Sequence, residues 1–143
     1  MSYQYKIDRE NNCIFVRHFG EMNVDEVREQ LEESSRDSNF KQHMNLLRDL
    51  SNATLHKDYN FLRFHKVRLD VMRPLDQVLG IDRRVAWVLG NAKDYAVIHQ
   101  LSASTKLNRQ VAARKPFRDL KKALAWLGLP SDHSIAYPDP ASA

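Results

Sequence analysis

The side chains able to do chemistry are six histidines, one cysteine and the hydroxyl groups of a polar loop in mid-chain. A metal site needs several ligands at suitable spacing, and no pair of these histidines has such spacing with a supporting third ligand. His56, Asp58 and His65 lie near one another in sequence, but scattered surface histidines explain them better. No Cys-x-x-Cys pair is present either, so the sequence predicts no metal site.

Ser51 and Thr54 are the hydroxyl residues of that loop. A hydrolase places its nucleophile beside a general base on a sharp, glycine-rich turn, and the loop has no such turn. Both hydroxyls are expected to bond their own backbone as turn formers. The chain also lacks a phosphate-binding loop and a dinucleotide fingerprint. We therefore predict a non-enzymatic protein without a cofactor.

Cys13 is the single cysteine of the 143-residue chain and lies in an apolar segment. An internal disulfide is therefore excluded, and a buried thiol in a reducing compartment is expected. No apolar run approaches the 18 residues that a membrane-spanning helix requires. The sequence predicts a cytoplasmic protein with no membrane span.

Charge is unevenly distributed, because residues 23–40 are mainly acidic and residues 105–122 mainly basic. Two solvated faces of opposite sign explain this pattern most simply, although it is also compatible with a homodimer. Nucleic-acid binding would require exposed aromatic rings among the basic residues. Phe117 and Trp126 are instead expected in the core, so nucleic acid is not the predicted partner.

The elements that position these residues alternate between strands and helices. Residues 3–8 and 13–19 are predicted to form a hairpin, and Asn23 caps the following helix, with Glu26 in the capping-box position. The later elements are a strand at 44–50, a loop at 51–54, a long helix from Asp58 to Pro74, a turn at 75–79 closed by Gly80, strands at 84–89 and 110–117, a helix carrying Tyr95, Ile98 and Leu101, and a helix at 120–127 capped by Asp119.

This order predicts a single α/β domain over residues 1–129, with a mixed, mostly parallel five-stranded sheet and about four helices. Residues 130–143 contain three prolines and no periodicity, which is typical of a flexible C-terminal tail.

The chain resembles the anti-sigma-factor antagonist (STAS) domains and the related SpoIIAA-like and CRAL-TRIO-like bacterial proteins. The resemblance covers the order of elements from Tyr3 to Leu127, and the segments that carry it are 20–23 with the helix after it, 47–54 and 117–127. In the antagonists, the loop after the third strand leads to a serine that a partner kinase phosphorylates. Asp58 stands about where that serine would be. Because a serine kinase cannot modify aspartate, Asp58 is either a permanent negative charge at a helix N-terminus or a plain helix cap.

The resemblance implies two functions. The first is a regulatory protein-interaction module whose unknown protein partner binds Ser51, Thr54, His56, Asp58 and Tyr59. The alternative is a binder of a small lipophilic ligand, in a pocket between the long helix and the sheet. Its walls would be Phe61, Phe64, Val71 and Met72, a stripe that is also typical of plain core.

Overall fold

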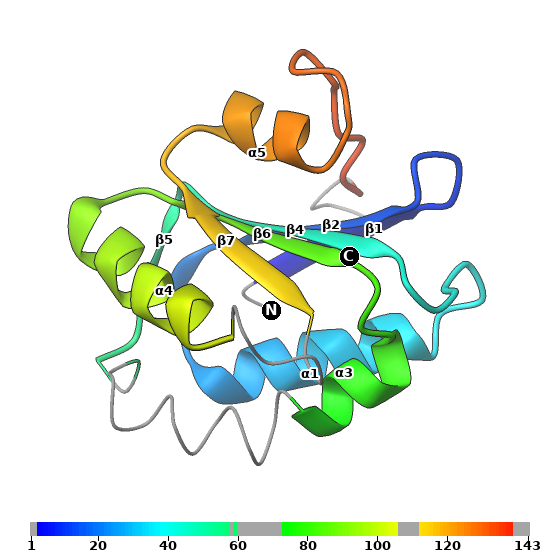
Figure 1. Ribbon diagram of the computed structural model, residues 1–143, viewed down its shortest axis with the longest axis horizontal. Coiled ribbons are helices and arrows are strands. Elements are labelled where there is room, and N and C mark those ends of the chain that lie inside the picture. The colour runs from blue at the N-terminus through cyan, green and yellow to red at the C-terminus, as the bar shows by residue number, and fades with distance from the viewer. Residues whose placement is uncertain (1–2, 58, 60–72, 106–111, 139–143) are drawn as a thin grey trace.

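The computed structural model describes residues 3–57, 59, 73–105 and 112–138 (Figure 1). The described residues form four helices; three lie where the sequence predicts helices, and the fourth, Arg73–Leu79, covers the residues predicted as a turn. The elements in chain order are β1 (Tyr3–Asp8), β2 (Cys13–His18), β3 (Gly20–Met22), α1 (Val24–Ser35), β4 (Asn45–Leu50), β5 (Ala53–Leu55), α3 (Arg73–Leu79), β6 (Arg84–Leu89), α4 (Ala92–Thr105), β7 (Ala113–Phe117) and α5 (Leu120–Trp126).

The main sheet has five strands in the order β1-β2-β4-β6-β7. The β1–β2 pair is antiparallel, and the other three pairs are parallel, which confirms the predicted mixed sheet. Because the parallel strands follow one another in one direction, right-handed crossovers place their connecting helices on one face. Figure 1 shows α1 and α3 on one side of the sheet and α5 on the other.

Each face of the sheet carries its own hydrophobic core. Side chains alternate between the two faces along a strand, so Leu46 and Leu50 of β4 join the core beneath α1, α3 and α4. Leu47 joins the second core, which includes Leu124 of α5. Arg48 lies between Leu46 and Leu50 on the first face, in the middle of the central strand.

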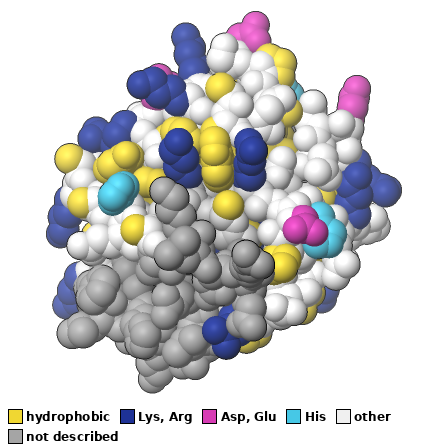
Figure 2. Space-filling view, viewed as in Figure 1, with side chains coloured by type: hydrophobic (Ala, Val, Ile, Leu, Met, Phe, Trp, Pro, Cys, Tyr) yellow, Lys and Arg dark blue, Asp and Glu magenta, His cyan; other side chains and the backbone are white. Residues whose placement is uncertain are grey.

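The cations of β7 and its neighbours cover aromatic rings of the second core. Phe117 is buried, and the partly buried Trp126 packs against it with ring centroids 5.7 Å apart. Lys115 lies over the ring of Phe117, and Arg84 lies over that of Trp126. Figure 2 shows basic side chains flanking hydrophobic ones on this face of the molecule. Both rings therefore pack with the core, as predicted.

β3 and β5 form a second sheet, whereas the sequence predicts a loop at residues 51–54. The two strands pair in parallel, with Glu21 opposite Thr54. A strand of three residues is too short to show a period-two pattern, and its partner lies about thirty positions away, so no local signal indicates the pairing. Gly20, with φ of +69°, turns the chain from β2 into β3.

The predicted helix caps are confirmed for α1 and α5. The Asn23 side chain accepts a hydrogen bond from the backbone of Glu26, and Asp119 accepts one from Lys121. Pro74, which the sequence predicts to end the long helix, lies within α3, and the segment before Arg73 is outside the described part. Gly80 follows α3 with φ of +95°, consistent with the predicted closure. The predicted helix start at Asp58, and residues 60–72, lie outside the described part.

Residues 130–138 pack against the second core, whereas the sequence predicts a flexible tail at 130–143. Ile135 and Tyr137 are partly buried there, and His133 stacks on Phe15 with ring centroids 5.5 Å apart. These apolar side chains are spaced too irregularly to indicate an element, but the open face of β2 gives them a surface to cover. The flexibility of this segment stays a prediction.

Candidate functional site

Parallel strands bring their carboxyl ends to one edge of the sheet, which is where open α/β sheets commonly bind ligands. Here β2 ends at His18 and β4 at Leu50, and β3 and β5 extend from them beyond that edge. The loop that the sequence analysis selected for partner binding therefore lies at this edge.

Three of the five predicted partner-binding residues come together there. Ser51 and Thr54 are exposed, and the half-buried His56 lies 3.5 Å from the carboxylate of Glu21. Tyr59 is only 7% exposed and packs in the first core, so it offers a partner little area. Asp58 lies outside the described residues, as do the predicted pocket residues Phe61, Phe64, Val71 and Met72.

The turn after β4 is held by its own side chains; the sequence predicts that the Ser51 hydroxyl bonds the backbone, but it bonds the Asp49 carboxylate instead. Asp49 Oδ1 accepts hydrogen bonds from the backbone N–H of Ser51, at 2.9 Å, and from its hydroxyl, at 2.6 Å. A hydroxyl that donates to a carboxylate in a turn stabilises the loop. The bond assigns Ser51 a structural role, whatever else it contacts.

Phe19 is the residue of this edge that sequence reasoning missed. It is 37% exposed, and the only other exposed large hydrophobic side chain among the described residues is Val78, on α3. Phe19 continues the alternating pattern of β2, so the sequence indicates only that the strand goes on. We use the term carboxyl-edge surface for Phe19, Glu21, Ser51, Asn52, Thr54 and His56.

A cavity of about 330 Å³ adjoins the carboxyl-edge surface on the α5 side of the sheet; its lining includes Phe19, Asn52, Asp49, Arg17 and Tyr137. The guanidinium of Arg17 lies 4.4 Å from the centre of the Tyr137 ring and 5.5 Å from that of Phe19, an arrangement that favours cation–π attraction. Burial, and next the charge of Asp49, raise the pKa of Tyr137. The segment expected to be a loose tail thus supplies part of the cavity wall.

The opposite face of the same strands carries a buried polar pair. Arg48 is 1% exposed, and its Nη1 lies 2.9 Å from Nε2 of His18. Nδ1 of His18 lies 3.4 Å from the carboxylate of Glu26, the residue expected in the capping-box position. Arg48 also lies beside Trp87, its partner on β6, with its guanidinium carbon 5.3 Å from the ring centre.

Burial is the largest cause of the pKa shifts of His18, Glu26 and Arg48. It lowers the pKa of His18 to about 2, with the charge of Arg48 acting in the same direction. It raises the pKa of Glu26, although the charge of Arg48 opposes that shift. It lowers the pKa of Arg48 to about 10, so this guanidinium remains charged at neutral pH. A buried cation thus lies beside a neutral imidazole.

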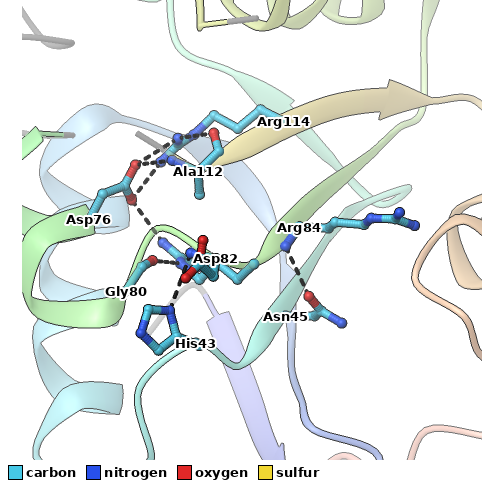
Figure 3. Close-up of polar contacts among 9 residues, drawn as sticks. His43, Asn45, Asp76, Gly80, Asp82, Arg84, Ala112 and Arg114 are labelled. Atoms are coloured by element: carbon cyan, nitrogen blue, oxygen red, sulfur yellow. Dashed lines mark hydrogen bonds and ion pairs between the residues drawn. The ribbon is translucent and has the colours of Figure 1, made fainter. Parts of the chain in front are cut away.

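A second buried cluster joins α3 to the starts of β6 and β7. The carboxylate of Asp76 accepts hydrogen bonds from the guanidinium groups of Arg83 and Arg114, at 2.8 to 3.0 Å, and from the backbone of Ala112 (Figure 3). Burial alone would raise the pKa of Asp76, but the charges of Arg114 and Arg83 outweigh it and lower that pKa. The carboxylate and both guanidinium groups form hydrogen bonds within the cluster, so we assign the cluster a structural role.

A cavity of about 590 Å³ lies near this cluster, at the amino ends of the parallel strands. Polar groups that line this cavity already form hydrogen bonds with other parts of the protein. Asn45 accepts a hydrogen bond from the backbone of Arg84, and the Arg84 side chain donates to the carbonyl of Trp126. His43 nearby accepts a bond from the backbone of Asp82 (Figure 3). This cavity offers few unused polar groups to a ligand.

No cluster of three or more histidine, cysteine, aspartate or glutamate side chains suited to a metal occurs in the described part of the chain. Within the same residues, no helix has the length and apolar character needed to cross a membrane.

The chain is similar to a solved structure over most of its length. That structure is of an uncharacterized protein from the DUF3478 family, with a SpoIIAA-like fold, from Shewanella loihica PV-4. The TM-score is 0.51 and the sequence identity 16%, over 88% of this chain and 93% of that chain. The protein therefore has a SpoIIAA-like α/β fold, which confirms the predicted fold. No family model matches the sequence, and neither does any curated protein.

Proposed function

We propose that this protein is a non-enzymatic regulatory module of the cytoplasm that binds another protein through the carboxyl-edge surface. The observation that carries the proposal is the exposed ring of Phe19 at the edge where Ser51, Asn52 and Thr54 are also exposed. An aromatic anchor surrounded by hydrogen-bonding side chains is the usual composition of an interface hot spot.

The resemblance to STAS domains supports the same surface, because their regulatory serine follows the corresponding loop. Here Asp58 occupies that position, so phosphorylation of a serine there is not the proposed switch.

Affinity capture from the native cells tests the proposal with three forms of the protein. The wild type should retain a partner in defined stoichiometry. Phe19→Ser should weaken its binding by about tenfold or more, since truncating a hot-spot aromatic residue commonly costs about 2 kcal/mol. Val78→Ser is the matched control, because Val78 is 54% exposed but lies on α3. Equal capture by wild type and Phe19→Ser would exclude this surface.

The second candidate function is binding of a small lipophilic ligand on the face covered by α1, α3 and α4. The observation that favours it is Arg48, a buried cation on that face whose Nε has no hydrogen-bond acceptor among the described residues. Native mass spectrometry of the protein from its own cells tests this function. A reproducible small-molecule adduct would support it, and a bare chain would count against it.

A further inference from the structure

We infer that Arg48 is the receptor for the carboxylate of a small organic acid, bound on the face of the sheet beneath α1, α3 and α4. This inference rests on the second candidate function and specifies the chemical class of its ligand. Its starting point is the position of Arg48, in the middle of β4 and therefore of the five-stranded sheet. The neighbouring side chains on that face, Leu46 and Leu50, are apolar and buried.

Arg48 keeps its charge in this position. Burial lowers its pKa only to about 10, so the side chain is a cation at neutral pH. A buried charge is tolerated when an opposite charge and hydrogen bonds compensate for lost hydration. The described part of the chain places no carboxylate within 4.0 Å of this guanidinium. The expected counter-charge is missing from these residues.

His18 lies between Arg48 and the carboxylate of Glu26. Arginine can only donate hydrogen bonds, so Nε2 of His18 is the acceptor and its proton is on Nδ1. That proton faces Glu26, at 3.4 Å, on the opposite side of the imidazole ring. Glu26 therefore contacts the neutral histidine, and its raised pKa weakens it further as a counter-ion.

Buried N–H groups without an acceptor include two more beside His18 Nδ1 on this face. These two are Nε of Arg48 and Nε1 of Trp87, for which the described residues supply no hydrogen-bond partner. The two side chains are neighbours on adjacent strands. A carboxylate supplies what this face lacks, because it combines a negative charge with two acceptor oxygens and matches the guanidinium geometry.

The other side chains on this face indicate the chemical character of the part of the ligand that carries the carboxylate. Val16, Val85 and Leu89 are buried apolar residues of the same core, so an apolar body suits it better than a polar one. The other buried arginine, Arg83, is 5% exposed, and its charge is compensated by an ion pair with Asp76. Among the described residues, a carboxylate thus compensates Arg83 and none compensates Arg48, which is the charge that the inferred ligand would pair with.

The test uses hexanoate as the apolar acid, hexanamide as its neutral analogue and acetate as a free small acid. Hexanoate should raise the Tm of the wild type by at least about 2 °C and shift the ¹⁵N resonance of Arg48 Nε, and hexanamide should do neither. Arg48→Met should lose the response. If acetate acts as strongly as hexanoate, Arg48 binds a free small acid; a response to hexanoate alone assigns the apolar acid.

Stability without ligand gives an independent readout. Arg48→Met should unfold at the same Tm as the wild type or higher, because an apolar side chain replaces an uncompensated charge. Arg48→Lys, which keeps the charge but not the planar fork, should fold and bind hexanoate at least about tenfold more weakly. Equal responses to hexanoate and hexanamide would overturn the role of Arg48 while leaving lipophilic binding in place. No change in Tm or in the Arg48 resonance with either acid would also overturn it.

Discussion

Nη1 of Arg48 and Nε2 of His18 lie 2.9 Å apart in the buried layer beneath α1, with the arginine as the donor. This bond fixes the tautomer of His18, because its Nε2 must carry a lone pair and its proton must be on Nδ1. It also links two strands, β2 and β4, on the face where the ligand is inferred. Protonating His18 would place two cations side by side, so folding and charge are coupled here.

We predict that His18 makes the protein less stable in mild acid. Its pKa is about 2 in the folded state and near 6.5 in the unfolded chain, so the unfolded state binds the proton between these values. The contribution of the neutral His18 imidazole to the free energy of unfolding is full above pH 6.5 and decreases as the pH falls below that value. The loss should reach roughly 2 kcal/mol at pH 5, at about 1.4 kcal/mol per pH unit. Urea unfolding between pH 7.5 and 5 measures it.

The control is His18→Gln, whose amide oxygen can still accept from Arg48. This variant should lose less stability between pH 7.5 and 5 than the wild type. Glu26 acts in the opposite direction, because its raised pKa gives most stability in acid, but both proteins carry it. Parallel pH curves for the two proteins would show that His18 titrates normally.

The sequence allowed the main sheet and the helix caps to be predicted because their signals are local. Asn23 and Asp119 precede amphipathic segments, and the apolar run at 84–89 is long enough to indicate a covered strand. The β3–β5 pair depends on contacts between distant three-residue segments, which leave no pattern. The same holds for Tyr137, whose burial depends on the open face of β2.

The candidate site was predicted only in part. Ser51 and Thr54 were found through the resemblance, whereas Phe19 was hidden within the pattern of a strand. A signal for Arg48 was present, since it is the one cation in an apolar run at 44–50. Alternation alone does not say whether a neighbouring element covers such a side chain, so its burial could not be inferred.

We predict that Gly80→Ala destabilises the protein more than Gly128→Ala. Both glycines have positive φ, at +95° and +80°, so both variants carry a similar backbone penalty. A Cβ on Gly80 would also lie 2.5 Å from Nδ1 of His43, whereas one on Gly128 meets nothing within 4 Å. The difference in unfolding free energy should be about 1 kcal/mol or more. The Cβ on Gly80 would also lie 2.7 Å from the backbone nitrogen of His43, so equal losses in urea unfolding would mean that both the side chain and the backbone of His43 shift at little cost.

The packed segment at 130–138 should protect the single cysteine. Tyr137 packs against the core that contains Cys13, and burial raises the pKa of this thiol. Tyr137→Ala should therefore lower stability by about 1–2 kcal/mol and speed alkylation of Cys13 several-fold. Ala136→Ser, at an exposed position of the same segment, is the control and should change neither quantity. An unchanged alkylation rate in Tyr137→Ala would show that this residue does not cover Cys13.

The two buried arginines should respond in opposite ways to the same substitution. Arg83→Met leaves the fully buried Asp76 with one of its two cations, so it should destabilise the protein by about 3 kcal/mol, within the range for breaking a buried ion pair. Asp76→Asn should cost at least as much, because it leaves two guanidinium groups without a counter-charge. Arg48→Met removes no ion pair with a described residue and should be neutral or stabilising. Urea unfolding at pH 7 without ligand ranks the three variants. A loss for Arg48→Met as large as that for Arg83→Met would mean that Arg48 supports the fold rather than a ligand.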